Sequence, residues 1–305
     1  MRGPSRRIAQ AAVTLVGAAV LVWSLQLLAP GDPARRVLVA NGVGNPTPTQ
    51  VAALRAELGL DEPAPVRLGR WLLAAATGDL GRSWRSGAPV AAELADRLPA
   101  TLRLAAVALG FALLLAVPLA LIAQHRRADL AARGLVFLGA AVPSFVVGTL
   151  LLEVVVVRLG IGRVLADGSW GGAVLPAVPL ALAAAAVWAR VLRAAMLEVR
   201  ARRHVQVARA RGAGRLRVLL VHVLPGASPP LFTAIGMTVG SLLAGAAVVE
   251  TIFTWPGVGP YLVEAIVARD VPVVQGTVLL GVLAYVVANT LADLAAAAVD
   301  PGRAR

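Results

Sequence analysis

The chain has 305 residues, 58% of them hydrophobic, and its mean hydropathy is +0.78. It contains no cysteine, which excludes disulfides and cysteine metal sites, and no lysine, which excludes an ordinary Walker A nucleotide-binding loop. The formal charge of +13 comes from arginines that cluster in short segments beside apolar runs, a distribution typical of membrane orientation rather than of nucleic-acid binding.

The apolar residues form stretches of about 20, the length that crosses the hydrocarbon core of a bilayer. We therefore predict an all-α, polytopic membrane protein with six transmembrane helices. Their predicted ranges are residues 8–29, 100–123, 134–157, 173–192, 227–252 and 273–297. The first run follows three arginines, as a signal peptide would, but it is too long for a typical signal sequence and lacks a convincing cleavage site. We predict a retained first helix, with cleavage as the alternative.

The arginine distribution predicts the topology. The segments assigned to the cytoplasmic side hold 17 arginines against three acidic residues. The segment 30–99, assigned to the outside, holds eight arginines against seven acidic residues. Since positive charge accumulates on the cytoplasmic side, both termini should be cytoplasmic.

The outer segment 30–99 carries signals for short helices. Thr47 to Gln50 has the pattern of a capping box with Pro48 at the first helical position, and Gly59 should end that helix. A second short helix is expected around residues 66–76, where Trp71 would lie at the membrane interface. The segment either helps receive an external binding protein or packs as a lid on the helices.

Residues 193–225 form the only long polar interval in the second half of the chain. Nine arginines lie between Arg190 and Arg217, opposed only by Glu198, which places the interval on the cytoplasmic face. A short helix is predicted over residues 204–211, followed by a break at Gly212 and Gly214. A second helical run over residues 216–224 is predicted to end at Pro225.

This interval resembles the cytoplasmic motif of ABC-importer permease subunits, E-A-A, three residues, G, nine residues, I-x-L-P. With Gly212 on the motif's glycine, Ala208, Leu224 and Pro225 also match, whereas Gln206, Val207 and His222 depart from it. The peptide and nickel branch of the family usually reads like ARAKG, which is similar to the string Ala208-Arg209-Ala210-Arg211-Gly212. The resemblance implies that an ATPase subunit contacts the motif region. The residues concerned are His204, Gln206, Val207, Ala208, Arg209, Ala210, Arg211, Gly212, Leu224 and Pro225. The simpler alternative is that the arginines only enforce topology.

Further strings of the same branch occur along the chain. Three of them occur as LAPGDP at 28–33, ELGLD at 57–61 and GDLGRS at 78–83. In addition, residues 250–259 are similar to the family string ETVFSWPGLG, and Arg269 to Gly276 is similar to ARDYPVVQG. The resemblance therefore covers nearly the whole chain. It implies the type I importer permease fold and the first of two permease subunits for di- or oligopeptides or for nickel chelates.

The resemblance also implies a division of labour. The expected parts are a first helix at 1–29, an outer segment at 30–99, a five-helix permease core at 100–300 with its coupling loop at 193–225, and a cytoplasmic tail at 301–305. The expected partners are a second permease, two cytoplasmic ATPase subunits, an extracytoplasmic binding protein and membrane lipid. ATP and magnesium would bind to the ATPase subunits, and this chain would be neither an enzyme nor a holder of cofactors. The expected location is the cytoplasmic membrane.

Residues that could carry chemistry are few. The three histidines, His125, His204 and His222, lack the spacing of a metal site or a catalytic triad. Candidates for the pathway or for helix interfaces are Pro143, Ser144, Gly236, Gly240, Asn289 and Asp293. Gly236 and Gly240 have the spacing that lets two helices approach closely, and Asn289 and Asp293 share a helix face. Two rival functions remain open: an ion-gradient transporter in which Asp293 carries protons, and a membrane scaffold whose basic loop recruits an anionic partner.

Overall fold

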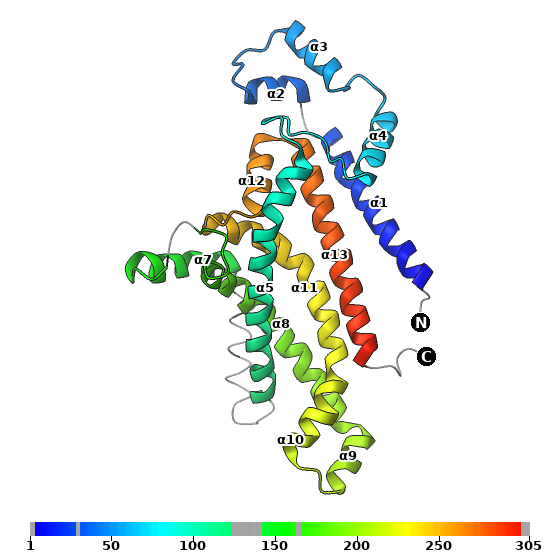
Figure 1. Ribbon diagram of the computed structural model, residues 1–305, viewed down its shortest axis with the longest axis vertical. Helices are drawn as coiled ribbons and strands as arrows, with labels where there is room; N and C mark the ends of the chain where they lie inside the picture. The colour runs from blue at the N-terminus through cyan, green and yellow to red at the C-terminus, as the bar shows by residue number, and fades with distance from the viewer. Residues whose placement is uncertain are drawn as a thin grey trace. The chain divides into compact units, whose positions relative to one another are not determined.

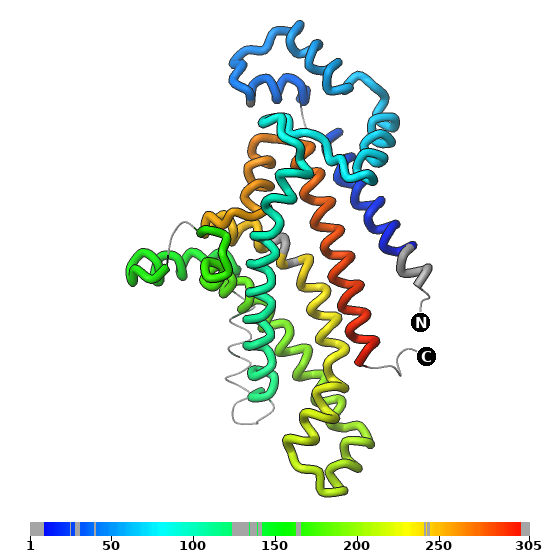
Figure 2. The backbone as a smooth tube through the Cα atoms, viewed as in Figure 1, coloured from blue at the N-terminus to red at the C-terminus, as the bar shows by residue number. Residues whose placement is uncertain are grey.

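The computed structural model describes residues 4–28, 31–123, 134, 139, 142–162 and 166–299. Within these ranges every regular element is a helix, apart from one isolated bridge between Arg82 and Pro89. The chain divides into two units (Figures 1 and 2). The first comprises residues 100–256 and 284–305, and the second comprises residues 2–99 and 257–283. The fold is therefore all-α in its described part, as the sequence predicts.

Within the described residues, four helical stretches are long and apolar enough to cross a membrane. They are Val90–Ile122 (α5), Val174–Ala201 (α8), Arg215–Gly240 and Val271–Val299 (α13). A shorter apolar stretch, Ala9–Ser24, lies within α1 (Pro4–Leu28), where the first span is expected. Of the third predicted span, 134–157, only residues 135–138, 140 and 141 lie outside the described residues. Its described part contains α7 (Ser144–Leu151) and the π-helical η1 (Leu152–Arg158). The charged segment 124–133 and the tail 300–305 also lie outside the described residues.

Two long helices run through prolines and extend past the predicted ends of their spans. Helix α5 begins at Val90, ten residues before the predicted start of the span, and continues through Pro99 and Pro118. Helix α8 contains Pro176 and Pro179 and runs on to Ala201, nine residues past the predicted end. Both helices therefore extend beyond the span limits predicted at residues 100 and 192. A proline removes one hydrogen bond, while the rest of a long apolar helix keeps its backbone paired.

Small side chains build the core of the first unit. Helices α8 and α11 (Leu224–Ile252) make its most extensive helix pair, and α7 packs against both. Ala112, Ala116 and Ala120 form a fully buried stripe on α5 that belongs to the same core cluster as the alanines of α8. Alanine allows helices to approach closely, and this close packing stabilises helices that gain no hydrophobic energy from lipid. Trp188 is fully buried, and its indole N–H donates to the Thr238 hydroxyl at 2.9 Å.

The second unit contains the short helices of the outer segment. These are α2 (Pro33–Ala40), α3 (Pro48–Glu57) and α4 (Ala64–Ala76), together with α12 (Val258–Ala268). Both hydrogen bonds of the predicted capping box between Thr47 and Gln50 are present, and Gly59 adopts φ +63° just after α3. The predicted helix near 66–76 is α4. Helix α12 was not predicted from the sequence, in which residues 250–272 have the pattern of a connection.

An ion-pair cluster ties α2 to α3. Arg55 lies 2.6 Å from a carboxylate oxygen of Asp32 and 2.9 Å from one of Asp61. Asp32 also caps α2 by accepting from the amide of Ala34 at 2.8 Å. Burial opposes ionisation of Asp32, but the bonds from Arg55, Ala34 and Arg35 outweigh it and lower the pKa of this carboxyl.

Candidate functional site

The arginine-rich interval folds into a compact elbow between α8 and α11, which we define as residues 202–225 and call the arginine elbow (Figure 1). Helix α8 ends at Ala201, and Arg202 turns the chain with φ −69° and ψ 143°. Helix α9 (Arg203–Ala210) follows, close to the predicted short helix at 204–211. Residues 193–201, predicted as part of the loop, belong to α8 instead.

The turn after α9 depends on Gly212. This residue has φ +83°, the left-handed region that side chains with a Cβ adopt only at a cost. The amide of Gly212 donates to the carbonyl of Arg209 at 2.9 Å, and the amide of Ala213 donates to the carbonyl of Ala208 at 3.1 Å. These two bonds form a Schellman motif, which satisfies the last carbonyls of α9. The backbone geometry therefore favours a glycine at this motif position.

The second half of the elbow is helical without interruption. The short α10 (Arg215–Arg217) passes into the π-helical η2 (Val218–Val223) and then into α11. The prediction that the helix ends at Pro225 was wrong. The π-helical pairing ends just before this proline, and Pro225 lies in the first turn of α11, where its missing N–H costs no regular hydrogen bond.

The inner side of the elbow is anchored in the core of the first unit. Val205, Val218 and Val223 are all at most 3% exposed and belong to the cluster built around Trp188 and the α8 alanines. The rings of His204 and His222 lie 6.3 Å apart, so the two ends of the motif meet across the elbow. The side-chain amide of Gln206 donates to the carbonyl of Ala201 at 3.1 Å, which links α9 to the end of α8.

The outer side of the elbow combines positive charge with apolar side chains. The arginines at 203, 209, 211, 215 and 217 are all exposed. Three apolar side chains lie in the same segment and are also exposed: Val207 is 40%, Leu216 is 68% and Leu220 is 52% exposed. Only Arg202 has a described acidic partner in this region, Glu198, at 2.8 Å. Exposed apolar side chains within a cationic surface are typical of a protein-binding face. Of the remaining motif residues, Leu224 is partly buried and Pro225 is exposed.

The candidate pathway residues separate into distinct places. Within the first unit, a Cβ placed on Gly236 would lie 2.8 Å from Ala292 Cβ and 3.0 Å from Asn289 Oδ1, and one on Gly240 would lie 2.6 Å from the Tyr285 ring. Gly236 and Gly240 thus permit a close contact of α11 with α13, whereas their spacing predicted a close helix approach without naming the partner. Asn289 donates its side-chain amide to the carbonyl of Tyr285 at 3.0 Å, whereas Asp293 is exposed.

Pro143 and Ser144 lie elsewhere in the first unit, at the start of α7. Pro143 occupies the N-cap position and Ser144 is the first helical residue. Pro143 therefore marks a helix start rather than a kink within a helix. No contact with the α11–α13 interface is described for either residue.

A buried clasp in the second unit was not anticipated. The Ser83 hydroxyl donates to the Asp270 carboxylate at 2.5 Å, and the amides of Trp84 and Arg85 donate to the same carboxylate at 3.1 and 3.3 Å. Ser83 and Asp270 belong to the GDLGRS-like and ARDYPVVQG-like strings, which are 187 residues apart in the sequence. The shared family strings were the available signal, but only the fold shows that they meet.

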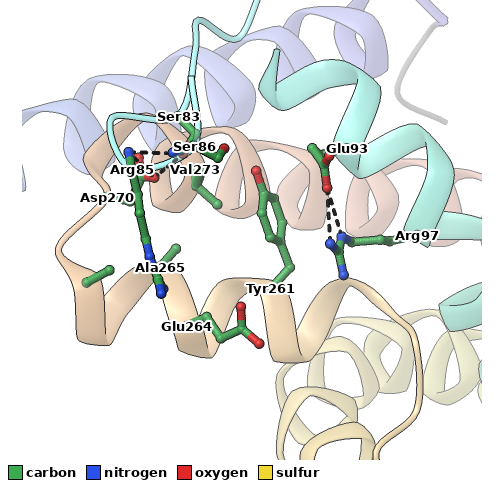
Figure 3. A pocket seen from close by; sticks show the side chains of 11 residues that line it. Ser83, Arg85, Ser86, Glu93, Arg97, Tyr261, Glu264, Ala265, Asp270 and Val273 are labelled. Carbon is green, nitrogen blue, oxygen red and sulfur yellow. Dashed lines mark hydrogen bonds and ion pairs between the residues drawn. The ribbon is translucent and has the colours of Figure 1, made fainter. Parts of the chain in front are cut away.

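The clasp borders a polar pocket of about 400 Å³ (Figure 3). Arg97 pairs with Glu93 at 3.0 Å and lies over the Tyr261 ring with its guanidinium carbon 4.7 Å from the ring centroid. Burial, reinforced by the charges of Glu93 and Asp270, raises the pKa of Tyr261, so this hydroxyl is protonated at neutral pH. Arg85 and Glu264 also line the pocket. The arrangement offers charges of both signs to a polar partner and contains no assembled catalytic group.

The described residues contain no group of three or more side chains suited to hold a metal ion. His125, one of the three histidines, lies outside the described residues.

Two family models together match nearly the whole chain. Residues 97–305 match the binding-protein-dependent transport system inner membrane component, and residues 2–105 match the N-terminal part of such membrane components.

Curated relatives agree with this match over almost their full length. The dipeptide transport system permease protein of Escherichia coli K12 is 36% identical over 330 residues, covering 97% of this chain and 96% of the relative. A glutathione transport system permease protein of Salmonella paratyphi A is 36% identical over 94% of both chains. A putative peptide transport system permease protein of Brucella suis is 37% identical over 97% of this chain and 96% of the relative. With its apolar spanning helices, this chain belongs to the family of inner membrane components of binding-protein-dependent transport systems.

Proposed function

We propose that this chain is one of two permease subunits of an ABC importer that carries di- or oligopeptides across the cytoplasmic membrane. The names of the relatives support a peptide-like substrate, including glutathione. The observation that carries the proposal is the arginine elbow, because its inner valines are fixed in the core while its outer face exposes Val207, Leu216 and Leu220 among arginines. That surface suits a soluble partner with acidic and apolar groups.

In this proposal two ATPase subunits bind ATP and magnesium, and the elbow transmits their movement to the helices. The rigid Schellman turn at Gly212 and the direct continuation from α10 to α11 allow a displacement of the elbow to move a spanning helix as one body. A second permease supplies the other half of the pathway. The outer segment 30–99 helps receive the extracytoplasmic binding protein, and the mixed charges of the pocket in Figure 3 support that role.

The proposed topology has six spans with both termini in the cytoplasm, and the five-helix core occupies residues 100–300. The chain has no cysteine, so single cysteines introduced at exposed positions can report sidedness without background. In intact cells an impermeant maleimide should label Ser86→Cys in the outer segment and should leave Ala210→Cys in the elbow unlabelled. Labelling of Ala210→Cys from outside would refute the topology and the role of the elbow.

Replacement of Gly212 by tryptophan tests the coupling role. The substitution adds bulk at the elbow and puts a Cβ on a left-handed residue, so ATPase copurification and ATP-dependent peptide uptake should collapse while membrane insertion persists. Gly42→Trp is the matched control, because Gly42 also has a positive φ, +90°, and open space around its Cβ, but lies in the outer segment. Unchanged uptake with Gly212→Trp would count against the proposal.

The same assay separates the rival transport mechanism. An ion-gradient transporter would import peptide without ATPase subunits, would stop on addition of an uncoupler, and would lose activity with Asp293→Asn. The present proposal predicts that uptake requires the ATPase subunits and tolerates Asp293→Asn.

A further inference from the structure

An aromatic pocket in the second unit, separate from the clasp pocket, has features of a ligand site. Its volume is about 240 Å³, and three tryptophans line it, Trp23 of α1, Trp71 of α4 and Trp84 of the following loop. Trp23 is only 4% exposed, so it forms a fixed wall. Arg67, Arg70, Gln26 and Gln275 also line the pocket, and none of its described lining residues is acidic.

Arg67 is a cation without an ion-pair partner among the described residues. Its guanidinium carbon lies 5.6 Å from the centroid of the Trp23 ring, and its Nη1 makes only a long hydrogen bond, 3.4 Å, to the carbonyl of Leu60. Burial and, second, the charge of Arg55 lower the pKa of Arg67, while Glu62 opposes the shift. Glu62 is itself paired with Arg70. The guanidinium of Arg67 therefore retains donors and charge for an external anion.

Gln275 adds a buried polar group that lacks a partner. Its side chain belongs to a residue only 4% exposed at the start of α13, and its amide nitrogen makes no hydrogen bond within the described structure. Leaving a buried amide without a partner is costly, so such a group is normally satisfied by water or by a ligand. Arg67 and Gln275 both line this cavity, and the group that complements a guanidinium and an amide N–H is an oxygen acceptor with negative charge.

The surrounding indoles indicate where that acceptor comes from. Trp23 lies near the end of the apolar stretch Ala9–Ser24 of α1, a candidate for membrane insertion. Tryptophan is enriched where a spanning helix meets the lipid headgroups, because its ring is apolar and its N–H is polar. A pocket at that level would face the phosphate and glycerol region of phospholipids, with apolar walls for the adjoining hydrocarbon.

We infer that this pocket binds the phosphate of an anionic phospholipid, held by Arg67 and Gln275 against the walls of Trp23, Trp71 and Trp84. Because Arg70 is already paired with Glu62, Arg67 supplies the uncompensated positive charge, and a net-anionic headgroup suits it better than a headgroup that carries its own cation. The inference concerns a lipid site in the outer segment and does not depend on which solute the complex transports.

The test uses the purified full chain in neutral detergent and quenching of tryptophan fluorescence by lipids with brominated acyl chains. Phosphatidylglycerol should quench saturably at about tenfold lower concentration than phosphatidylcholine with the same chains, because the choline cation of phosphatidylcholine competes with Arg67 for the phosphate. Arg67→Gln should abolish this preference, and Gln275→Leu, which keeps the side-chain size, should weaken it severalfold.

Controls separate a built site from general charge attraction. Arg35→Gln removes the same charge from an exposed arginine on α2 outside the pocket and should leave the preference intact. Arg67→Lys keeps the positive charge and should retain part of the preference for phosphatidylglycerol. That result would show that the preference lost in Arg67→Gln depends on the charge at this position and not on misfolding caused by any substitution of Arg67. Equal losses in Arg35→Gln and Arg67→Gln, or no preference in the unaltered chain, would overturn the inference. Displacement of the lipid by millimolar inorganic phosphate would overturn the assignment to lipid.

Discussion

Replacement of Gly236 by alanine tests the close contact between α11 and α13. The added Cβ would lie 2.8 Å from Ala292 Cβ and 3.3 Å from the Asn289 Cα, whereas two carbon atoms pack best at about 3.5–4.0 Å. The backbone of α13 cannot rotate away as a flexible side chain would. The helices must therefore separate by up to about 1 Å at this point, and overpacking of this kind typically costs about 1–3 kcal/mol.

The helix propensity of alanine acts in the opposite direction. Alanine is favoured over glycine in a helix interior by about 1 kcal/mol, so the net effect of Gly236→Ala is smaller than the clash alone. Gly110→Ala is the matched control, because Gly110 is within helix α5 and a Cβ added there would meet nothing within 4 Å. The difference in stability between the two variants isolates the clash.

The assay is thermal unfolding of both purified variants in the same detergent. Gly236→Ala should unfold at a lower temperature than Gly110→Ala, and Ala292→Gly should partly restore it in the double variant, since it removes the nearest opposing methyl group. If Gly236→Ala is as stable as Gly110→Ala, the contact between α11 and α13 is not as close as described, and the reasoning fails.

Three further predictions concern polar side chains that hold loops and helices in place. Asp270→Ala should leave the Ser83 hydroxyl and two loop amides without their acceptor, cost about 1–3 kcal/mol, and expose residues 79–89 to limited proteolysis, while Asp270→Asn should have a smaller effect. Thr238→Val should remove the hydroxyl that accepts from the buried Trp188 indole N–H. The loss of this hydrogen bond should lower thermal stability by about 1–2 kcal/mol and shift Trp188 fluorescence. An unchanged melting curve would argue against this bond. Because the pKa of Asp32 is lowered from its ordinary value of 3.8, the stabilisation of α2 by Asp32 is complete above that pH and is lost as the pH falls through the lowered value. Hydrogen exchange of α2 should show this acid-induced opening in the unaltered chain and not in Asp32→Asn.

Local signals predicted much of the architecture. The capping box at Thr47, the turn at Gly59 and the Schellman glycine at Gly212 depend on backbone chemistry within a few residues, and the structure contains all three features. The apolar runs likewise indicated the spanning helices, because their length is set by the thickness of the bilayer. The spacing of Gly236 and Gly240 indicated a close helix contact without identifying its partner.

Helix boundaries at prolines were predicted poorly. A helix end was expected at Pro225, whereas the structure continues through this residue into α11. Helix α5 likewise contains Pro99, just before the predicted span. The local cost of a proline is one hydrogen bond and a steric clash, and whether a helix tolerates it depends on the packing and pairing of the residues around it. That balance cannot be read from the proline alone.

The amino-acid sequence by itself determined that the chain is helical, free of cysteine and lysine, and marked by one arginine-rich elbow. These properties follow from composition, periodicity and short-range backbone chemistry. Only the tertiary structure decided that Ser83 meets Asp270, that Gly236 faces Ala292, and that Arg67 and Gln275 share one pocket with Trp23. Such pairings depend on how distant helices pack, and the free energy of that packing is distributed over many contacts rather than encoded in any one segment.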